Sequence, residues 1–96
     1  MQNKVLADTL TIGQYRVGVT FNPGNNPLVD EIKRKSAELI DLCQSIKNDE
    51  ASKTYDKSPQ EKNETSGEIF RLIALAQTHY EDAAMWAVKA ATKPIR

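Results

Sequence analysis

Apolar and polar positions follow a helical period over the C-terminal third of the chain. At about 100° per residue, five polar residues of segment 65–93 fall within one narrow stripe: Arg71, Thr78, Asp82, Lys89 and Lys93. Apolar and small residues cover most of the remaining circumference. A helix on the surface of a monomer needs an apolar arc of only about 100° or somewhat more. The pattern therefore predicts a helix over residues 65–93 that packs against several partners, which favours self-assembly.

A second helical pattern covers residues 27–48 and follows a turn at residues 22–26. Asn26 is placed to cap this helix, and Pro27 suits its first position, where no backbone N–H is needed. Apolar or small residues form a heptad-like seam along the segment, made of Val29, Ile32, Ser36, Leu39, Cys43 and Ile46. The two segments together predict a long antiparallel helical hairpin.

The connection between the two helical segments is polar. Residues 49–64 hold almost no apolar side chains, so they cannot bury enough surface to order firmly and predict a flexible loop. Thr65 and Glu68 have the spacing of a capping box for the second helix. Pro94 then ends that helix, since proline cannot continue it.

The N-terminal region has a different period. Apolar residues alternate with other types over residues 14–21, the spacing of a half-buried strand, in which Tyr15, Val17, Val19 and Phe21 share one face. One strand is not stable alone, so its partner is either residues 5–12 or another subunit. Residues 1–13 are predicted as a tail or a short strand. The expected fold is mainly α: one domain, 1–96, with a helical hairpin after a short N-terminal β segment, oligomerising through its helices.

Composition excludes several functional classes. Acidic and basic residues balance at 13 each, so the chain lacks the basic field expected of a duplex nucleic-acid binder. No stretch is long and apolar enough to span a membrane, and no signal peptide is expected at the N-terminus. The single cysteine, Cys43, excludes an internal disulfide. A cytoplasmic protein is the resulting expectation.

No set of residues in the sequence predicts catalysis. Cys43 and His79 lie on different predicted helices, which suits neither a zinc site nor a nucleophile pair, and each fits a packed structural role better. Glu81 and Asp82 are adjacent on a helix and point about 100° apart, so they fit ion-paired or solvated carboxylates better than an acid/base pair. We expect no enzyme, no metal and no cofactor.

Several residue types favour binding of a small anionic ligand that contains bases. The candidate ligand residues are Tyr15, Arg16, Phe21, Asn25, Asn26, Lys33, Arg34, Arg71 and Thr78. Aromatic rings and guanidinium groups stack on bases, and arginine with threonine suits phosphates and hydroxyls. Each signal has a structural alternative: Lys33, Arg34 and the polar stripe also fit solvated helix faces. Tyr15 and Phe21 also fit a strand face packed on the hairpin.

The second helical segment resembles that of a phage helical-hairpin family that includes anti-CBASS and anti-Thoeris sponges. The family pattern is a basic residue with an apolar run, a threonine-containing polar step, a small- and aromatic-rich segment, and a basic residue before proline. Here it is filled by Arg71, Gln77, Thr78, Ala83, Ala84, Met85, Trp86, Lys93 and Pro94. The first segment, NPLVDEIKRKSAELIDLC, also fits, so the resemblance covers about half of the chain.

The resemblance implies a protein that sequesters the cyclic nucleotide messengers of bacterial immunity and cleaves nothing. Members assemble into oligomers, often hexamers, with cyclic dinucleotides or cyclic ADP-ribose isomers bound between subunits and, in some, cyclic trinucleotides in central pockets. For the ligand contacts it implies Tyr15 or Phe21 as the aromatic and Lys33 or Arg34 as the cation. Arg71 and Thr78 would line a central pocket. The predicted β segment before the hairpin is closer to the anti-Thoeris type.

The leading hypothesis is therefore a phage-encoded, homo-oligomeric sponge, with a hexamer favoured, that acts in the host cytoplasm. Which cyclic nucleotide it binds stays open. The alternative is a homo-oligomeric helical module that binds a protein through the same apolar surface.

Overall fold

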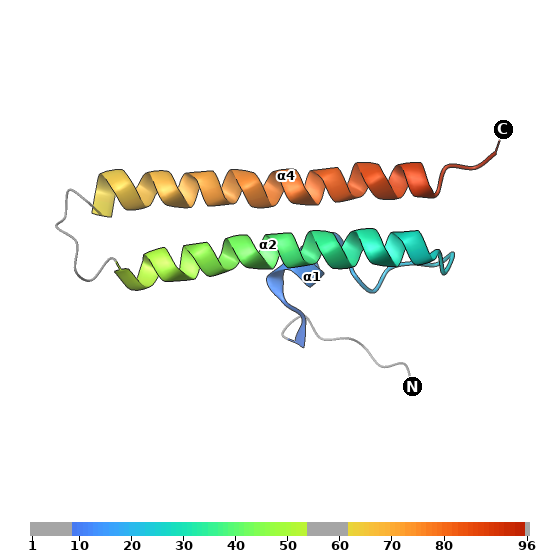
Figure 1. The fold of residues 1–96 in the computed structure, drawn as a ribbon, viewed down its shortest axis with the longest axis horizontal. Coiled ribbons are helices and arrows are strands. Elements are labelled where there is room, and N and C mark those ends of the chain that lie inside the picture. Colours follow the sequence, from blue (N-terminus) through green and yellow to red (C-terminus); the bar gives the residue numbers. More distant parts are fainter. Residues whose placement is uncertain (1–8, 54–61, 96) are drawn as a thin grey trace.

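The protein is a helical hairpin with a short helix packed on one side. In the computed structural model, residues 9–53 and 62–95 are described. The hairpin consists of α2 (Pro27–Lys53) and α4 (Gly67–Ala91), which run antiparallel side by side (Figure 1). Two shorter elements complete the fold, α1 (Ile12–Val17) and the π-helical turn η3 (Lys62–Ser66). The predicted mainly helical fold and its antiparallel hairpin are thus confirmed.

The start of α2 follows the predicted capping. The backbone N–H of Leu28 donates to Oδ1 of Asn26 at 2.9 Å, and Pro27 occupies the first helical position. The helix continues to Lys53, beyond the predicted end at residue 48. Lys53 pairs with Asp49 one turn earlier, at 3.0 Å. The predicted loop 49–64 is therefore wrong for residues 49–53 and 62–64, and its centre, residues 54–61, lies outside the described residues.

The start of α4 differs from the predicted capping box of Thr65 and Glu68. The N-cap residue is Ser66, which has helical backbone angles and makes no side-chain capping bond, because η3 leads directly into α4. The Ser66 hydroxyl instead donates to Oε2 of Glu50 at 2.8 Å, and both side chains are buried. This bond joins the two helices at the end of the hairpin where residues 54–61 connect them.

The hairpin core is narrow and includes polar as well as apolar side chains. Its buried apolar residues are Val29, Ala37, Ile40, Ile73 and Ala84. Gln77 is also buried, and its amide donates to the carbonyl of Ile40 and to Oε1 of Gln44, each at 3.2 Å. A buried amide with its partners satisfied holds the register of α4 against α2 at little cost.

The predicted heptad seam on α2 is correct only in part. Val29 is buried, but Leu39 and Ile46 are 41% and 51% exposed. The contact with α4 uses the neighbouring row, which passes through Ala37 and Ile40. Helix α1 packs beside the same row. The contacts of α1 and α4 with α2 therefore determine which row of α2 is buried. The exposed seam residues remain on an apolar flank of the hairpin.

The predicted strand over residues 14–21 is wrong, because residues 12–17 form α1. Thr11 caps this helix in a capping box with Gln14, and Gly18 ends it in the left-handed region at φ 66°. Local bonds at both ends thus satisfy the backbone of a helix, whereas residues 9–53 and 62–95 contain no strand that could pair with these residues. Residues 1–8 of the predicted tail lie outside the described residues.

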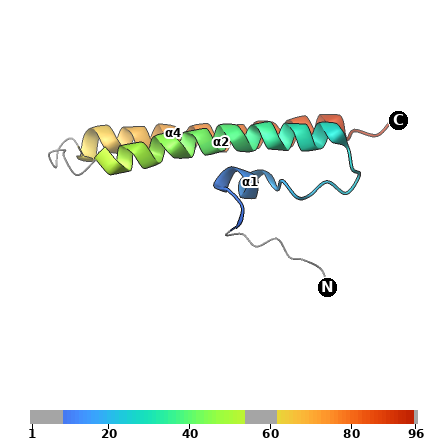
Figure 2. The same ribbon diagram turned by 60° about the horizontal axis from the view of Figure 1, so that its bottom comes forward.

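Helix α1 packs mainly on α2, as the turned view of the ribbon shows (Figure 2). Gly13 makes this close contact possible. Its backbone N–H donates to Oδ1 of Asp41 at 2.7 Å, and a Cβ atom there would collide with the carbonyl group of Ala37. The position therefore requires glycine for space.

We predict that Gly13→Ala loosens α1 from the hairpin. The added methyl group has no room against the α2 backbone, and overpacking of this kind costs about 1–3 kcal/mol. Amide hydrogen exchange of residues 12–17, together with the thermal unfolding midpoint, measures the effect. Gly67→Ala is the matched control, because nothing lies within 4 Å of that position. Equal exchange rates for α1 in wild type and Gly13→Ala would contradict this packing.

Candidate ligand-binding site

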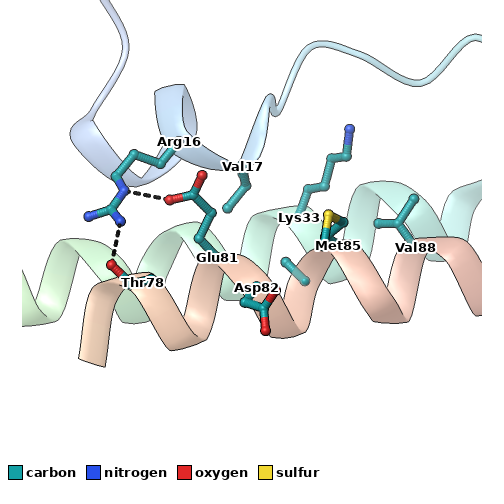
Figure 3. A pocket seen from close by; sticks show the side chains of 9 residues that line it. Arg16, Val17, Lys33, Thr78, Glu81, Asp82, Met85 and Val88 are labelled. Carbon is teal, nitrogen blue, oxygen red and sulfur yellow. Dashed lines mark hydrogen bonds and ion pairs between the residues drawn. The ribbon is translucent and has the colours of Figure 1, made fainter. Parts of the chain in front are cut away.

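A cavity of about 480 Å³ opens where α1, α2 and α4 meet. Its polar side chains are Arg16, Lys33, Thr78, Glu81 and Asp82, and its apolar wall consists of Val17, Ala84, Met85 and Val88 (Figure 3). The three elements come from distant parts of the sequence, so the cavity exists only when α1 is docked on the hairpin. Apolar walls with a few placed polar groups are typical of small-molecule sites.

Arg16 connects α1 to α4 across this cavity. Its Nε donates to Oε1 of Glu81 at 2.8 Å, a charge-assisted bond. The two terminal nitrogens make longer contacts of 3.4 Å, to Oε1 of Gln77 and to Oγ1 of Thr78. Figure 3 shows the guanidinium beside Glu81 and Thr78 at the cavity edge. The candidate residues Arg16 and Thr78 are thus brought together, by contacts that involve α1.

Lys33 is a buried cation, with only 7% of its surface exposed. Its ammonium group donates to the carbonyl oxygens of Gly18 and Phe21, at 3.0 and 2.5 Å, and lies 5.4 Å from the centre of the Phe21 ring. These contacts offset the cost of burying its charge. Lys33 therefore holds residues 18–26, which connect α1 to α2, against the hairpin, in addition to lining the cavity.

A second hollow of about 560 Å³ lies beside the first, at the turn and the end of α4. The candidate residues Phe21, Asn26 and Lys33 line it, and it shares Lys33 and Val88 with the first cavity. The Phe21 side chain is 69% exposed, so its ring has a free surface for stacking. Asn25 lies in the same turn with φ 50° but does not line the hollow.

Three other candidate residues line neither hollow. Tyr15 is 61% exposed on α1. Arg34 pairs with Glu31 on the surface of α2 at 2.7 Å, and Arg71 pairs with Glu68 at 2.7 Å near the start of α4. These hydrogen bonds raise the pKa of each guanidinium and lower the pKa of each carboxyl. Arg71 lies about two turns before Thr78 on α4 and, unlike Thr78, does not line the cavity.

Sequence reasoning missed Glu81 as a site residue and Lys33 as a buried one. By residue type Lys33 also fits a solvated helix face, although it lies four residues from both Val29 and Ala37, on the row that faces inward. That spacing could have revealed its burial. Nothing in the sequence alone could place Glu81 next to Arg16, because the contact depends on how α1 packs.

Within the described ranges, other kinds of site are not found. No group of three or more histidine, cysteine, aspartate or glutamate side chains lies close enough to hold a metal ion there. Cys43 is half-buried on α2 and His79 is exposed on α4, and neither lines a hollow. No helix in residues 9–53 and 62–95 is long and apolar enough to cross a membrane.

A two-helix scaffold with a short helix docked on it defines a small helical-hairpin protein. The family described as "Acb2/Tad1, hairpin domain" has a model that matches residues 13–92. The chain belongs to this family, which comprises the anti-CBASS and anti-Thoeris sponges. No curated protein and no solved structure matches the chain significantly. The resemblance inferred from the second helical segment is therefore confirmed.

We predict that Lys33→Met destabilises the packing of residues 18–26. The methionine fills similar space but leaves the Phe21 carbonyl without this donor, whereas the Gly18 carbonyl keeps the Phe21 N–H at 2.9 Å. A buried polar group left unsatisfied costs about 1–3 kcal/mol. Thermal unfolding and amide exchange in residues 18–26 measure this loss. Lys35→Met, at an exposed position of α2, should leave both unchanged. Equal unfolding midpoints and exchange rates in the two variants would show that Lys33 does not stabilise the packing of residues 18–26.

Proposed function

We propose that this protein binds and sequesters the cyclic nucleotide second messengers of bacterial CBASS or Thoeris defence without cleaving them. The ligand class is cyclic di- and trinucleotides or cyclic ADP-ribose isomers, and the protein is phage-encoded and acts in the host cytoplasm. Family membership supports the class. The observation that carries the proposal for this chain is the cavity that brings Arg16, Lys33 and Thr78 together.

The chemistry of the two hollows suits such a ligand. A cyclic nucleotide presents phosphates and base faces close together. Arg16 offers N–H donors at the cavity edge, and the hydroxyl of Thr78 lies 3.4 Å from one of its nitrogens. Val88 and Met85 supply an apolar wall, and the exposed Phe21 ring, which lines the second hollow together with Val88, suits stacking on a base.

Sequestration requires affinity and slow release instead of bond cleavage. Free messenger must fall below the concentration that activates the effector, so a low dissociation rate matters more than fast capture. A protein that acts in this way is consumed stoichiometrically, and its cavity needs donors and apolar walls rather than a nucleophile. Lys33 is already held in place by its own hydrogen bonds, which reduces the ordering cost on binding.

We predict that the wild-type protein binds a member of a panel of cyclic dinucleotides, cyclic trinucleotides and cyclic ADP-ribose isomers, and releases it intact. Calorimetry measures the binding, and mass spectrometry after heat release measures the state of the ligand. Linear products that increase with protein concentration would assign the protein to the phosphodiesterases instead.

Two matched arginine variants test where the ligand binds. Arg16→Ala should weaken binding by roughly 1.5–3 kcal/mol, the range for hydrogen bonds to charged groups, whereas Arg34→Ala removes the same charge from a surface ion pair and should not. Lys33 is unsuited to this test because it also holds the turn. Arg71→Ala would alter binding only of a ligand held at a separate, central site between subunits.

We also propose that the chain forms a homo-oligomer, with a hexamer favoured. Large apolar side chains remain 41–62% exposed on the hairpin, namely Leu39, Leu42, Ile46, Leu72, Leu75, Met85 and Trp86. Many lie at helical spacing along α2 and α4, so they form apolar flanks beside the narrow core. Exposed apolar surface of this extent marks an interaction site. Copies of the same chain that pack flank to flank would cover it.

We predict that Trp86→Glu dissociates or unfolds this oligomer. Trp86 is 57% exposed in the single chain, and a charge buried at a contact between subunits carries a large desolvation cost. Light-scattering mass and the unfolding midpoint are the measurements. Ser45→Glu, which adds the same charge at an exposed polar position of α2, is the control. A monomeric wild type, or an unchanged mass for Trp86→Glu, would contradict the proposal.

The same exposed residues support a second candidate function, a helical protein-interaction module. In that case the apolar flanks bind another protein, and the cavity at Arg16 holds no nucleotide. Absence of binding to every member of the panel would favour this alternative.

A further inference from the structure

The guanidinium of Arg16 already has an anionic partner in the free protein. Its Nε donates to the Glu81 carboxylate at 2.8 Å, and this is the only one of its three contacts shorter than 3.4 Å. The Arg16 and Glu81 side chains are 23% and 43% exposed, so the pair borders both the cavity and solvent (Figure 3). A ligand phosphate that approaches Arg16 therefore meets a carboxylate at the same group.

The geometry of this pair leaves it open to replacement. One carboxylate oxygen bonds one guanidinium nitrogen, so the ion pair is not the two-pronged arrangement that makes arginine pairs strong. A phosphodiester can engage two nitrogens of the same guanidinium. The other two contacts of Arg16 are long and go to the neutral groups of Gln77 and Thr78, which give way at little cost.

The surrounding charges do not compensate for two anions at one guanidinium. Lys33 is engaged with the carbonyl groups of Gly18 and Phe21. Asp82 lines the same cavity and adds a second carboxylate, so the lining carries two cations and two anions. A phosphate and the Glu81 carboxylate next to one guanidinium would repel each other at short range, where screening by salt is weak.

From this arrangement we propose that Glu81 occupies the phosphate position at Arg16 in the free protein and is displaced when an anionic ligand binds. Glu81 thereby competes with the ligand for the Arg16 guanidinium. A ligand binds there only if its contacts with Arg16 outweigh those that Glu81 makes. This inference rests on the proposed function, because it concerns the same cavity. In this role the Glu81 carboxylate blocks Arg16; it does not position Arg16 for the ligand.

The decisive variant is Glu81→Gln, which keeps the shape and removes the charge. If the ion pair limits access to Arg16, the dissociation constant of the ligand should fall about two- to sixfold in Glu81→Gln. This is the factor by which a partly exposed ion pair reduces the fraction of molecules whose Arg16 is free to bind. Calorimetry with cyclic GMP–AMP, cyclic triadenylate and cyclic ADP-ribose provides the measurement. In the Arg16→Ala background the same substitution should give no gain, because the guanidinium for which the anions compete is gone.

A control changes the same charge without freeing Arg16. Glu38→Gln removes a carboxylate from a surface pair with Arg34, away from the cavity. Tighter binding by Glu38→Gln, equal to that of Glu81→Gln, would mean a general field effect and would overturn the proposal. Weaker or unchanged binding by Glu81→Gln would also overturn it, since Glu81 would then position Arg16 or take no part.

A ligand-independent measurement separates this inference from the proposed function. Inorganic phosphate can be titrated while the Arg16 Nε–H signal is followed by NMR in wild type and Glu81→Gln. A lower phosphate midpoint in Glu81→Gln supports the competition even if no cyclic nucleotide binds, in which case the proposed function alone fails. An equal or higher midpoint overturns the competition, even if the wild type binds a cyclic nucleotide.

Discussion

The buried ammonium group of Lys33 is the interaction on which the arrangement of the site depends. It extends from the first third of α2 and binds two carbonyl groups in the connection between α1 and α2. Because that connection starts at the left-handed Gly18, holding it also fixes where α1 ends. The position of α1 in turn brings Arg16 to α4. One buried cation therefore links the start of the chain to a cavity whose other wall comes from residues 78–88.

The sequence predicts the hairpin but not the element docked on it. The long helices follow from periodicity and from the Asn26 cap, since those depend on local pattern. The alternation around Tyr15 instead favoured a strand, whereas the capping box of Thr11 with Gln14 forms a helix. That box satisfies the same spacing rule as the one predicted at Thr65, which the structure does not form. Local capping signals compete, and packing decides which is used.

The candidate site was predicted in composition but not in arrangement. Arg16, Lys33 and Thr78 were each identified by residue type, and the structure places them around one cavity. Arg34 and Arg71 were chosen on the same grounds, yet each is paired with a carboxylate within its own helix. Residue type alone cannot separate these cases, because all are cations on helices. The difference comes from tertiary packing, which also brings the carboxylate of Glu81 to Arg16.

Balanced charge has a consequence for how such a protein can select its ligand. With 13 acidic and 13 basic residues, no long-range field draws anions to the surface. Affinity for a phosphate must then come from groups at contact distance, and the two cations in the cavity are both engaged internally. An anion that also fills the apolar wall at Val88 and Met85 gains more than one that contacts Arg16 alone. Simple phosphates lack that second part, so the arrangement favours ligands that carry phosphate and base together.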